Sequence, residues 1–126
     1  MIKLVFVIRR RKELPPEEFH RYWLEEHGPL ARSLIEPLGA RRYVQTHTVD
    51  SELNAALAAS RGTVEAFDGI AEIWWDSPDD LVAAFGSEEG QRANATLTED
   101  EARFIDFERS SVFLTEEHAI LGEAQA

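Results

Sequence analysis

Two strand–helix–strand units follow one another along this chain, and this order of elements most constrains the fold. Strands are predicted where apolar, β-branched and aromatic residues concentrate, at residues 2–9, 40–49, 67–75 and 111–121. A polar, alanine-rich connection with one short helix separates the two units at residues 50–65. The order predicts an α+β, ferredoxin-like split βαβ fold, in which a four-stranded antiparallel sheet carries helices on one face.

Proline and serine mark the expected helix starts. Pro15-Pro16, followed by two glutamates, places proline in the first turn and carboxylates at the positive end of the helix dipole. We expect Gly28-Pro29 to interrupt this first helix. Ser77-Pro78-Asp79-Asp80 is typical of a capped helix start. A break at Gly86-Ser87 and a restart then predict interrupted helical structure towards Phe104.

Length, charge and the lack of cysteine limit the class of protein. The 126 residues correspond to one domain, which we assign to residues 1–121 with a flexible tail at 122–126. A net charge of −11 opposes binding to nucleic acid or anionic lipid. The chain has no cysteine and no segment near the roughly 20 apolar residues of a membrane span. We therefore expect a cytoplasmic protein that binds neither nucleic acid nor membrane.

Helices on one face of the sheet leave its other face uncovered. That open face is expected to carry a set of apolar and aromatic side chains: Val5, Val7, Tyr43, Ile70 and Trp74. Such a surface is too apolar to remain in contact with water. We predict a homodimer in which two open faces pack together and enclose a barrel-like space.

The second strand places three polar-tipped side chains, those of Tyr43, Gln45 and His47, on one face. If this face lines the enclosed space, they converge as pocket donors and acceptors; the alternative is a partly wetted polar face. The imidazole of His47 suits general acid–base chemistry near neutral pH, and Tyr43 would donate to a developing enolate oxygen. A one-residue shift of register would reverse this assignment.

His27 lies on the apolar stripe of the first helix, four residues after Trp23 and three before Leu30. It is either a core residue that bonds a carbonyl exposed at Gly28-Pro29 or a site residue. His20 lies one residue off the stripe and is expected to face solvent.

The third strand places Glu72 and Trp74 on one face and Trp75 on the other. In a closed cavity beside tryptophan, burial would raise the pKa of Glu72 and make it a workable acid or base. The alternative is an ion pair with Lys3 or Arg9. Trp74 would be a platform for a flat ligand, whereas Trp75 is expected to face the helices.

An ordered set of motifs along nearly the whole chain resembles the EthD domain family. The set comprises the first strand, Phe19-His20-Arg21-Tyr22-Trp23, His27-Gly28-Pro29-Leu30, Tyr43-Val44-Gln45-Thr46-His47, Asp68-Gly69-Ile70-Ala71-Glu72-Ile73-Trp74, Phe104-Ile105-Asp106 and Thr115-Glu116-Glu117-His118. The resemblance implies a dimeric α+β barrel. It also implies proton transfer on a small, flat, carbonyl-bearing molecule, since related domains dehydrate or decarboxylate polyketide-derived aromatics.

We therefore expect a cofactor-free lyase or isomerase that isomerises, dehydrates or decarboxylates a small aromatic or polyketide-like carbonyl compound. Its expected catalytic residues are His47, Tyr43 and His27, and its expected ligand-binding residues are Trp74, Glu72, Gln45, Arg9 and His118. No metal is expected, because the histidine spacing offers no HxH or HxxxH pattern. The alternatives are a non-catalytic protein that binds a small molecule and a cofactor-independent or haem-assisted oxygenase.

Overall fold

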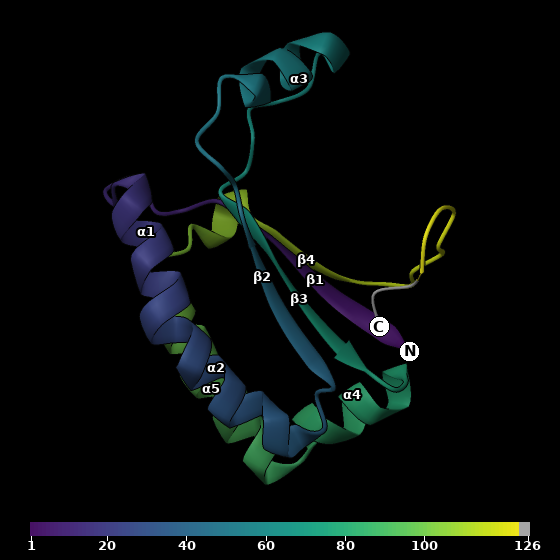
Figure 1. Cartoon of the computed structure of the whole chain (residues 1–126). Coiled ribbons are helices and arrows are strands. Elements are labelled where there is room, and N and C mark those ends of the chain that lie inside the picture. The colour runs from purple at the N-terminus through teal and green to yellow at the C-terminus, as the bar shows by residue number, and fades with distance from the viewer. Residues whose placement is uncertain (124–126) are drawn as a thin grey trace.

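The sheet has four antiparallel strands in the order β2-β3-β1-β4, in a computed structural model that describes residues 1–123. The strands are β1 (Ile2–Ile8), β2 (Arg42–His47), β3 (Gly69–Trp75) and β4 (Ser111–Thr115). Helices cover one face of this sheet, as Figure 1 shows. The predicted α+β, ferredoxin-like arrangement is confirmed.

The helical layer is formed by two long segments, one between β1 and β2 and the other between β3 and β4. The first contains α1 (Pro16–Tyr22), the π-helical turn η1 (Trp23–His27), α2 (Gly28–Ile35) and the 3-10 turn η2 (Glu36–Leu38). The second contains α4 (Pro78–Gly86), α5 (Glu88–Glu101) and the 3-10 turn η3 (Phe107–Arg109). In Figure 1, α2 and α5 lie side by side along the sheet, and α4 lies at the end of β3.

The prediction that Gly28-Pro29 interrupts the first helix is wrong, because helical structure continues from η1 through both residues into α2. The wider π turn lets the Gly28 N–H bond the Trp23 carbonyl, and Pro29 then falls in the first turn of α2. A proline at this position costs little stability, since the N–H group that it lacks would have no partner within the helix. The π turn brings Trp23 and His27 onto the buried face, whereas the three residues between them remain exposed.

The capped helix start predicted at Ser77 and the break predicted at Gly86-Ser87 are both present. Ser77 Oγ accepts the Asp80 N–H at 3.1 Å, and Ser87 Oγ accepts the Gly90 N–H at 2.9 Å. The expected interruptions within the second helix are absent from α5, which is continuous and ends at Glu101 rather than near Phe104. Gly90 permits close packing of the two helices, since a Cβ there would lie 1.8 Å from the Ala84 carbonyl oxygen.

The last strand is shorter than predicted, whereas the short helix expected in the connection is present. The last strand ends at Thr115, because the following chain turns and the Glu117 carboxylate accepts a hydrogen bond from the Trp74 indole at 2.8 Å. The expected short helix in the connection is α3 (Leu53–Arg61), which buries none of its side chains and projects beyond the sheet in Figure 1. Of the tail expected at 122–126, residues 124–126 lie outside the described part.

The register of β2 corrects the expected location of Tyr43. Tyr43 pairs with Ile73, which in turn pairs with Leu4, and directly paired residues point to the same face of a sheet. Leu4 and Ile73 face the helices, so Tyr43 does too, instead of sharing the open face with Trp74. The other expected members of the open face, Val5, Val7, Ile70 and Trp74, alternate with these helix-facing positions.

The hydrophobic core packs between the sheet and the helices in two clusters. The largest fully buried side chains are Ile8, Phe19, Trp23, Ile35, Trp75 and Phe104. Trp23 reaches the sheet because residue 69 is glycine: a Cβ at Gly69 would lie 2.4 Å from the indole ring. Trp75 packs with Phe85 of α4, as expected for a helix-facing residue. No helix among residues 1–123 is long and apolar enough to cross a membrane.

Candidate acid–base site

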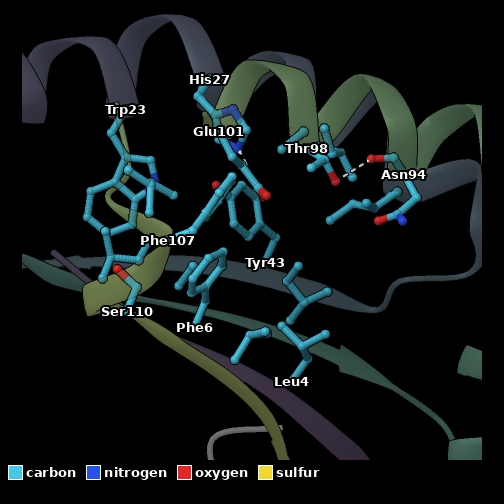
Figure 2. Close-up of a pocket in the computed structure, with 18 of the residues that line it drawn as sticks. Leu4, Phe6, Trp23, His27, Tyr43, Asn94, Thr98, Glu101, Phe107 and Ser110 are labelled. Atoms are coloured by element: carbon cyan, nitrogen blue, oxygen red, sulfur yellow. Dashed lines mark hydrogen bonds and ion pairs between the residues drawn. The ribbon is translucent and has the colours of Figure 1, made fainter. Parts of the chain in front are cut away.

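A cavity of about 420 Å³ lies between the helical layer and the sheet. Figure 2 shows side chains from both layers converging on it. Its walls are mainly aliphatic and aromatic, and include Leu4, Phe6, Ile35, Ile73, Trp75, Phe85 and Phe107. Its size and apolar lining are typical of a site for a small organic molecule.

His27 lines the cavity at the end of η1 and is only 4% exposed. Its Nδ1 lies 2.7 Å from Asp100 Oδ2, and the Tyr22 hydroxyl donates to Asp100 Oδ1 at 2.5 Å. A carboxylate only accepts hydrogen bonds, so Nδ1 carries the proton and Nε2 of the neutral ring keeps its lone pair. Burial lowers the pKa of His27, although Asp100 opposes this shift. The ring is therefore a neutral base near pH 7.

Glu101 lines the same wall, one residue after Asp100 at the end of α5. Burial, assisted by the charge of Asp100, raises the pKa of Glu101 to about 7. Its Oε2 lies 4.0 Å from His27 Nε2, beyond hydrogen-bond distance. In Figure 2 the two side chains point toward one another above Tyr43. Near neutral pH this wall therefore holds both a lone pair and a carboxyl group that can carry a proton.

Tyr43 contributes a hydroxyl to the cavity from β2. Gln45 Nε2 donates to this hydroxyl at 2.9 Å and to the Trp23 carbonyl at 2.8 Å. Burial raises the pKa of Tyr43, while the hydrogen bond from Gln45 opposes the shift. The phenol therefore remains protonated at neutral pH.

His47 shares the face of Tyr43 but is not among the residues that line the cavity. Its Nε2 lies 2.7 Å from Gln45 Oε1, and its Nδ1 lies 2.7 Å from His20 Nδ1. The ring also packs on Trp23, with centroids 4.3 Å apart. His20 is thus half-buried rather than solvent-facing, because α1 places it against the end of β2. Burial lowers the pKa of both histidines.

Glu72 and Trp74 lie on the open face, on the opposite side of the sheet from the cavity. Lys3 Nζ lies 2.6 Å from Glu72 Oε2 and 3.5 Å from Glu117 Oε1. The same ammonium lies 5.3 Å from the centroid of the Trp74 ring. Glu72 therefore forms an ion pair, the alternative weighed from the sequence, and Trp74 is only 2% exposed.

Arg9 and His118 also lie outside the cavity lining. The Arg9 guanidinium donates to the carbonyls of Glu65 and Ala66 and packs over the Phe67 ring. It therefore anchors the chain that leads from α3 into β3. His118 is exposed, with its Nε2 3.9 Å from Glu116 Oε1.

The structure thus brings His27 and Tyr43 together, with Gln45 directly behind Tyr43, and adds two residues that the sequence reasoning missed. Asp100 and Glu101 are the last two residues of α5, and Glu101 lies four residues after the buried Leu97. That helical spacing is the signal that would have placed a carboxylate on the buried face. Within residues 1–123, no group of three His, Asp or Glu side chains is arranged to hold a metal ion.

Comparison with known structures supports the fold. An EthD family protein from Bacillus halodurans is 20% identical with a TM-score of 0.63, over 94% of this chain and 99% of that one. A dimeric, ferredoxin-like protein of unknown function from Bacteroides fragilis is 14% identical with a TM-score of 0.52, over 92% and 95%. A cofactor-independent oxygenase from Streptomyces nogalater is 14% identical with a TM-score of 0.57, over 97% of each.

At these identities the likeness establishes the fold alone. No curated protein matches the sequence. The EthD domain itself matches residues 11–108, which include η1, β2, β3 and α5. The expected family is therefore confirmed: this chain belongs to the EthD domain family.

Proposed function

We propose that this protein is an enzyme that moves a proton on a small aromatic or polyketide-like carbonyl compound held in the cavity. One observation carries the proposal: His27, oriented by Asp100, and Glu101 meet at one wall of an apolar cavity. Acid–base sites typically combine two titratable groups whose surroundings set different proton affinities. The apolar walls favour a flat, hydrophobic substrate, and the polar wall favours one that carries oxygen.

The proposed reaction begins with His27 as the base. Its Nε2 removes a proton from a carbon adjacent to the substrate carbonyl, and the Tyr43 hydroxyl donates a hydrogen bond to the resulting enolate oxygen. Protonated Glu101 then delivers its proton to another carbon in an isomerisation, or to a departing hydroxyl group in a dehydration. The Glu101 carboxylate finally takes the proton from the His27 imidazolium, which restores both groups.

We also propose that the active form is a homodimer that pairs through the open sheet face. The apolar residues of this face, Val5, Val7, Ile70 and Val44, are only partly covered within one chain. One structural neighbour is described as dimeric, which supports the proposal. Packing of two such faces would remove their apolar side chains from water.

An oxygenase reaction is the second candidate, favoured by the structural neighbour described as a cofactor-independent oxygenase. In that case His27 would remove a hydroxyl proton from a phenol or quinol, and molecular oxygen would add to a ring carbon of the resulting anion to form a hydroperoxide. Loss of water from the hydroperoxide would leave one oxygen atom on that carbon as a new carbonyl group. A third possibility is a protein that binds the same class of molecule without transforming it.

One experiment separates these functions. A thermal-shift screen of phenols, naphthols, quinols, lactones and bicyclic ketones first identifies ligands. Each ligand is then incubated with the protein in D2O under air, with NMR detection of deuterium incorporation and an oxygen electrode. We expect exchange at carbon next to the carbonyl without oxygen uptake. Oxygen uptake with a quinol would favour the oxygenase, and binding with neither reaction would contradict an enzymatic role.

A further inference from the structure

We infer that Gln45 is a positioning residue that holds the Tyr43 hydroxyl as an obligate hydrogen-bond donor to the cavity. The cavity therefore selects ligands that place a hydrogen-bond-accepting oxygen, a ketone or phenolate, at that position. This inference rests on the proposed function because it concerns the same cavity, but ligand selection by Tyr43 does not require that the ligand is turned over.

The orientation of the Gln45 amide follows from its fixed partners. The Trp23 carbonyl lies 2.8 Å from one amide atom, and a carbonyl only accepts, so that atom is the NH2 nitrogen. The same nitrogen lies 2.9 Å from Tyr43 Oη, so Tyr43 accepts in this contact. The Tyr43 proton therefore points away from Gln45 and is available to a molecule in the cavity that Tyr43 lines.

Two features of the backbone make this contact possible. In the π turn the Trp23 carbonyl accepts from the Gly28 N–H and also from the Gln45 side chain. Gly28 leaves room for that side chain, because a Cβ there would lie 3.2 Å from Gln45 Nε2. Irregular helical turns of this kind occur frequently at functional sites.

A histidine pair fixes the amide from its other end. Gln45 Oε1 lies 2.7 Å from His47 Nε2, which must therefore carry a proton. In the neutral His47 ring Nδ1 then has no proton, so it accepts from His20 Nδ1 at 2.7 Å. The amide cannot flip without placing its NH2 group against the His47 N–H and its oxygen against the Trp23 carbonyl. This explains why His47 shares a face with Tyr43 while lying outside the cavity.

The test uses 1-tetralone and tetralin, two bicyclic probes of similar shape, of which only the first carries a carbonyl oxygen. We expect the wild-type protein to bind 1-tetralone about five- to tenfold more tightly, the usual effect of one hydrogen bond. The variant Y43F should bind both probes equally. The variant Q45E should do the same although Tyr43 is present, because a carboxylate accepts the Tyr43 proton and turns it away from the cavity.

An infrared measurement distinguishes positioning from a general structural effect. The carbonyl stretch of bound 1-tetralone should move to lower frequency in the wild type and return to its unperturbed position in both Y43F and Q45E. The variant Q45M removes the donor without adding a charge, so the ratio of its affinities for 1-tetralone and tetralin should lie between those of the wild type and Q45E. It also controls for misfolding of Q45E. Wild-type selectivity in Q45E or Y43F, or failure of the wild type to bind either probe, would overturn the inference. Unchanged selectivity in H27Q, with its exchange lost, would show that ligand selection and proton transfer are separate.

Discussion

His27 Nδ1 and Asp100 Oδ2 lie 2.7 Å apart although 73 positions separate the two residues in the sequence. This contact joins the π turn η1 to the last turn of α5 and fixes which imidazole nitrogen carries the proton. The cavity-facing nitrogen is left as a base. The proposed chemistry thus depends on contact between the end of η1 and the end of α5, which are far apart in the sequence.

Replacement of Asp100 by asparagine should impair proton transfer. An amide does not stabilise the imidazolium that forms when His27 takes a proton, so we expect exchange to slow by about 100-fold. The pKa of His27, already lowered by burial, should fall further because Asp100 no longer raises it. An NMR titration of the imidazole, run with the exchange assay, measures both effects.

The matched control is E99Q, which removes an exposed carboxylate from the same helix one residue away. It should leave exchange and the His27 titration unchanged. Equal rates for D100N and the wild type would show that Asp100 does not orient the base.

Glu101 should make the folded protein less stable as the pH rises through neutrality. Its pKa is raised from 4.5 to about 7 by burial, so the folded state favours the protonated carboxyl. The resulting stabilisation is complete below pH 4.5, where the unfolded chain is also protonated, and is lost as the pH approaches and passes 7. A shift of this size corresponds to about 3 kcal/mol.

Urea unfolding between pH 4 and 8 measures this effect. The variant E101Q should be more stable than the wild type above pH 7, and its unfolding free energy should depend less on pH. If both proteins showed the same pH dependence, Glu101 would have an ordinary pKa and would not supply the proposed acid.

Substitution of Gly69 by alanine should destabilise the fold by about 2–3 kcal/mol, the usual cost of forcing extra volume into a packed core. Its Cβ would lie 2.4 Å from the Trp23 ring and 2.8 Å from the Thr46 carbonyl, which leaves it no space. Gly86 at the end of α4 has no atom within 4 Å of the corresponding position, so G86A is the control. Chemical denaturation of both variants tests the expectation, and similar midpoints would refute the close contact of Trp23 with β3.

Charge placed on the open sheet face should dissociate the proposed dimer. Ile70 lies on this face, across from Val7 in the register, and I70E would bury a carboxylate between two sheets. Light scattering at micromolar concentration should show a monomer for I70E. The matched variant V82E, at an exposed position of α4, should retain the dimer. A monomeric wild type would contradict the proposed homodimer.

The order of elements was predictable because each one has a strong local signal. The helix starts at Pro16 and Pro78 follow from proline and capping chemistry, and the strands follow from β-branched runs. The continuity of the helix through Pro29 was not predictable, because it depends on a π turn that packs Trp23 and His27 against the sheet. Local propensity favoured a break there, and tertiary packing overcame it.

The site was harder to predict because it depends on strand register and on distant helix ends. The face that Tyr43 presents is decided by its pairing with Ile73, and a shift of one residue reverses it. His47 was predicted as the base because it shares a strand face with Tyr43 and Gln45, but both of its ring nitrogens are hydrogen-bonded, to Gln45 and to His20. Asp100 and Glu101 carried no motif, and only the packing of α5 on α2 brings them to His27.

The most direct test compares two histidine variants in one assay. Deuterium incorporation next to the carbonyl of 1-tetralone, or of the best ligand from the screen, is followed by NMR for the wild type, H27Q and H47Q. We predict a loss of about 100-fold or more in H27Q and a much smaller change in H47Q, because only His27 presents a free lone pair to the cavity. Full exchange in H27Q, with loss in H47Q, would contradict the account and assign the base to the other histidine.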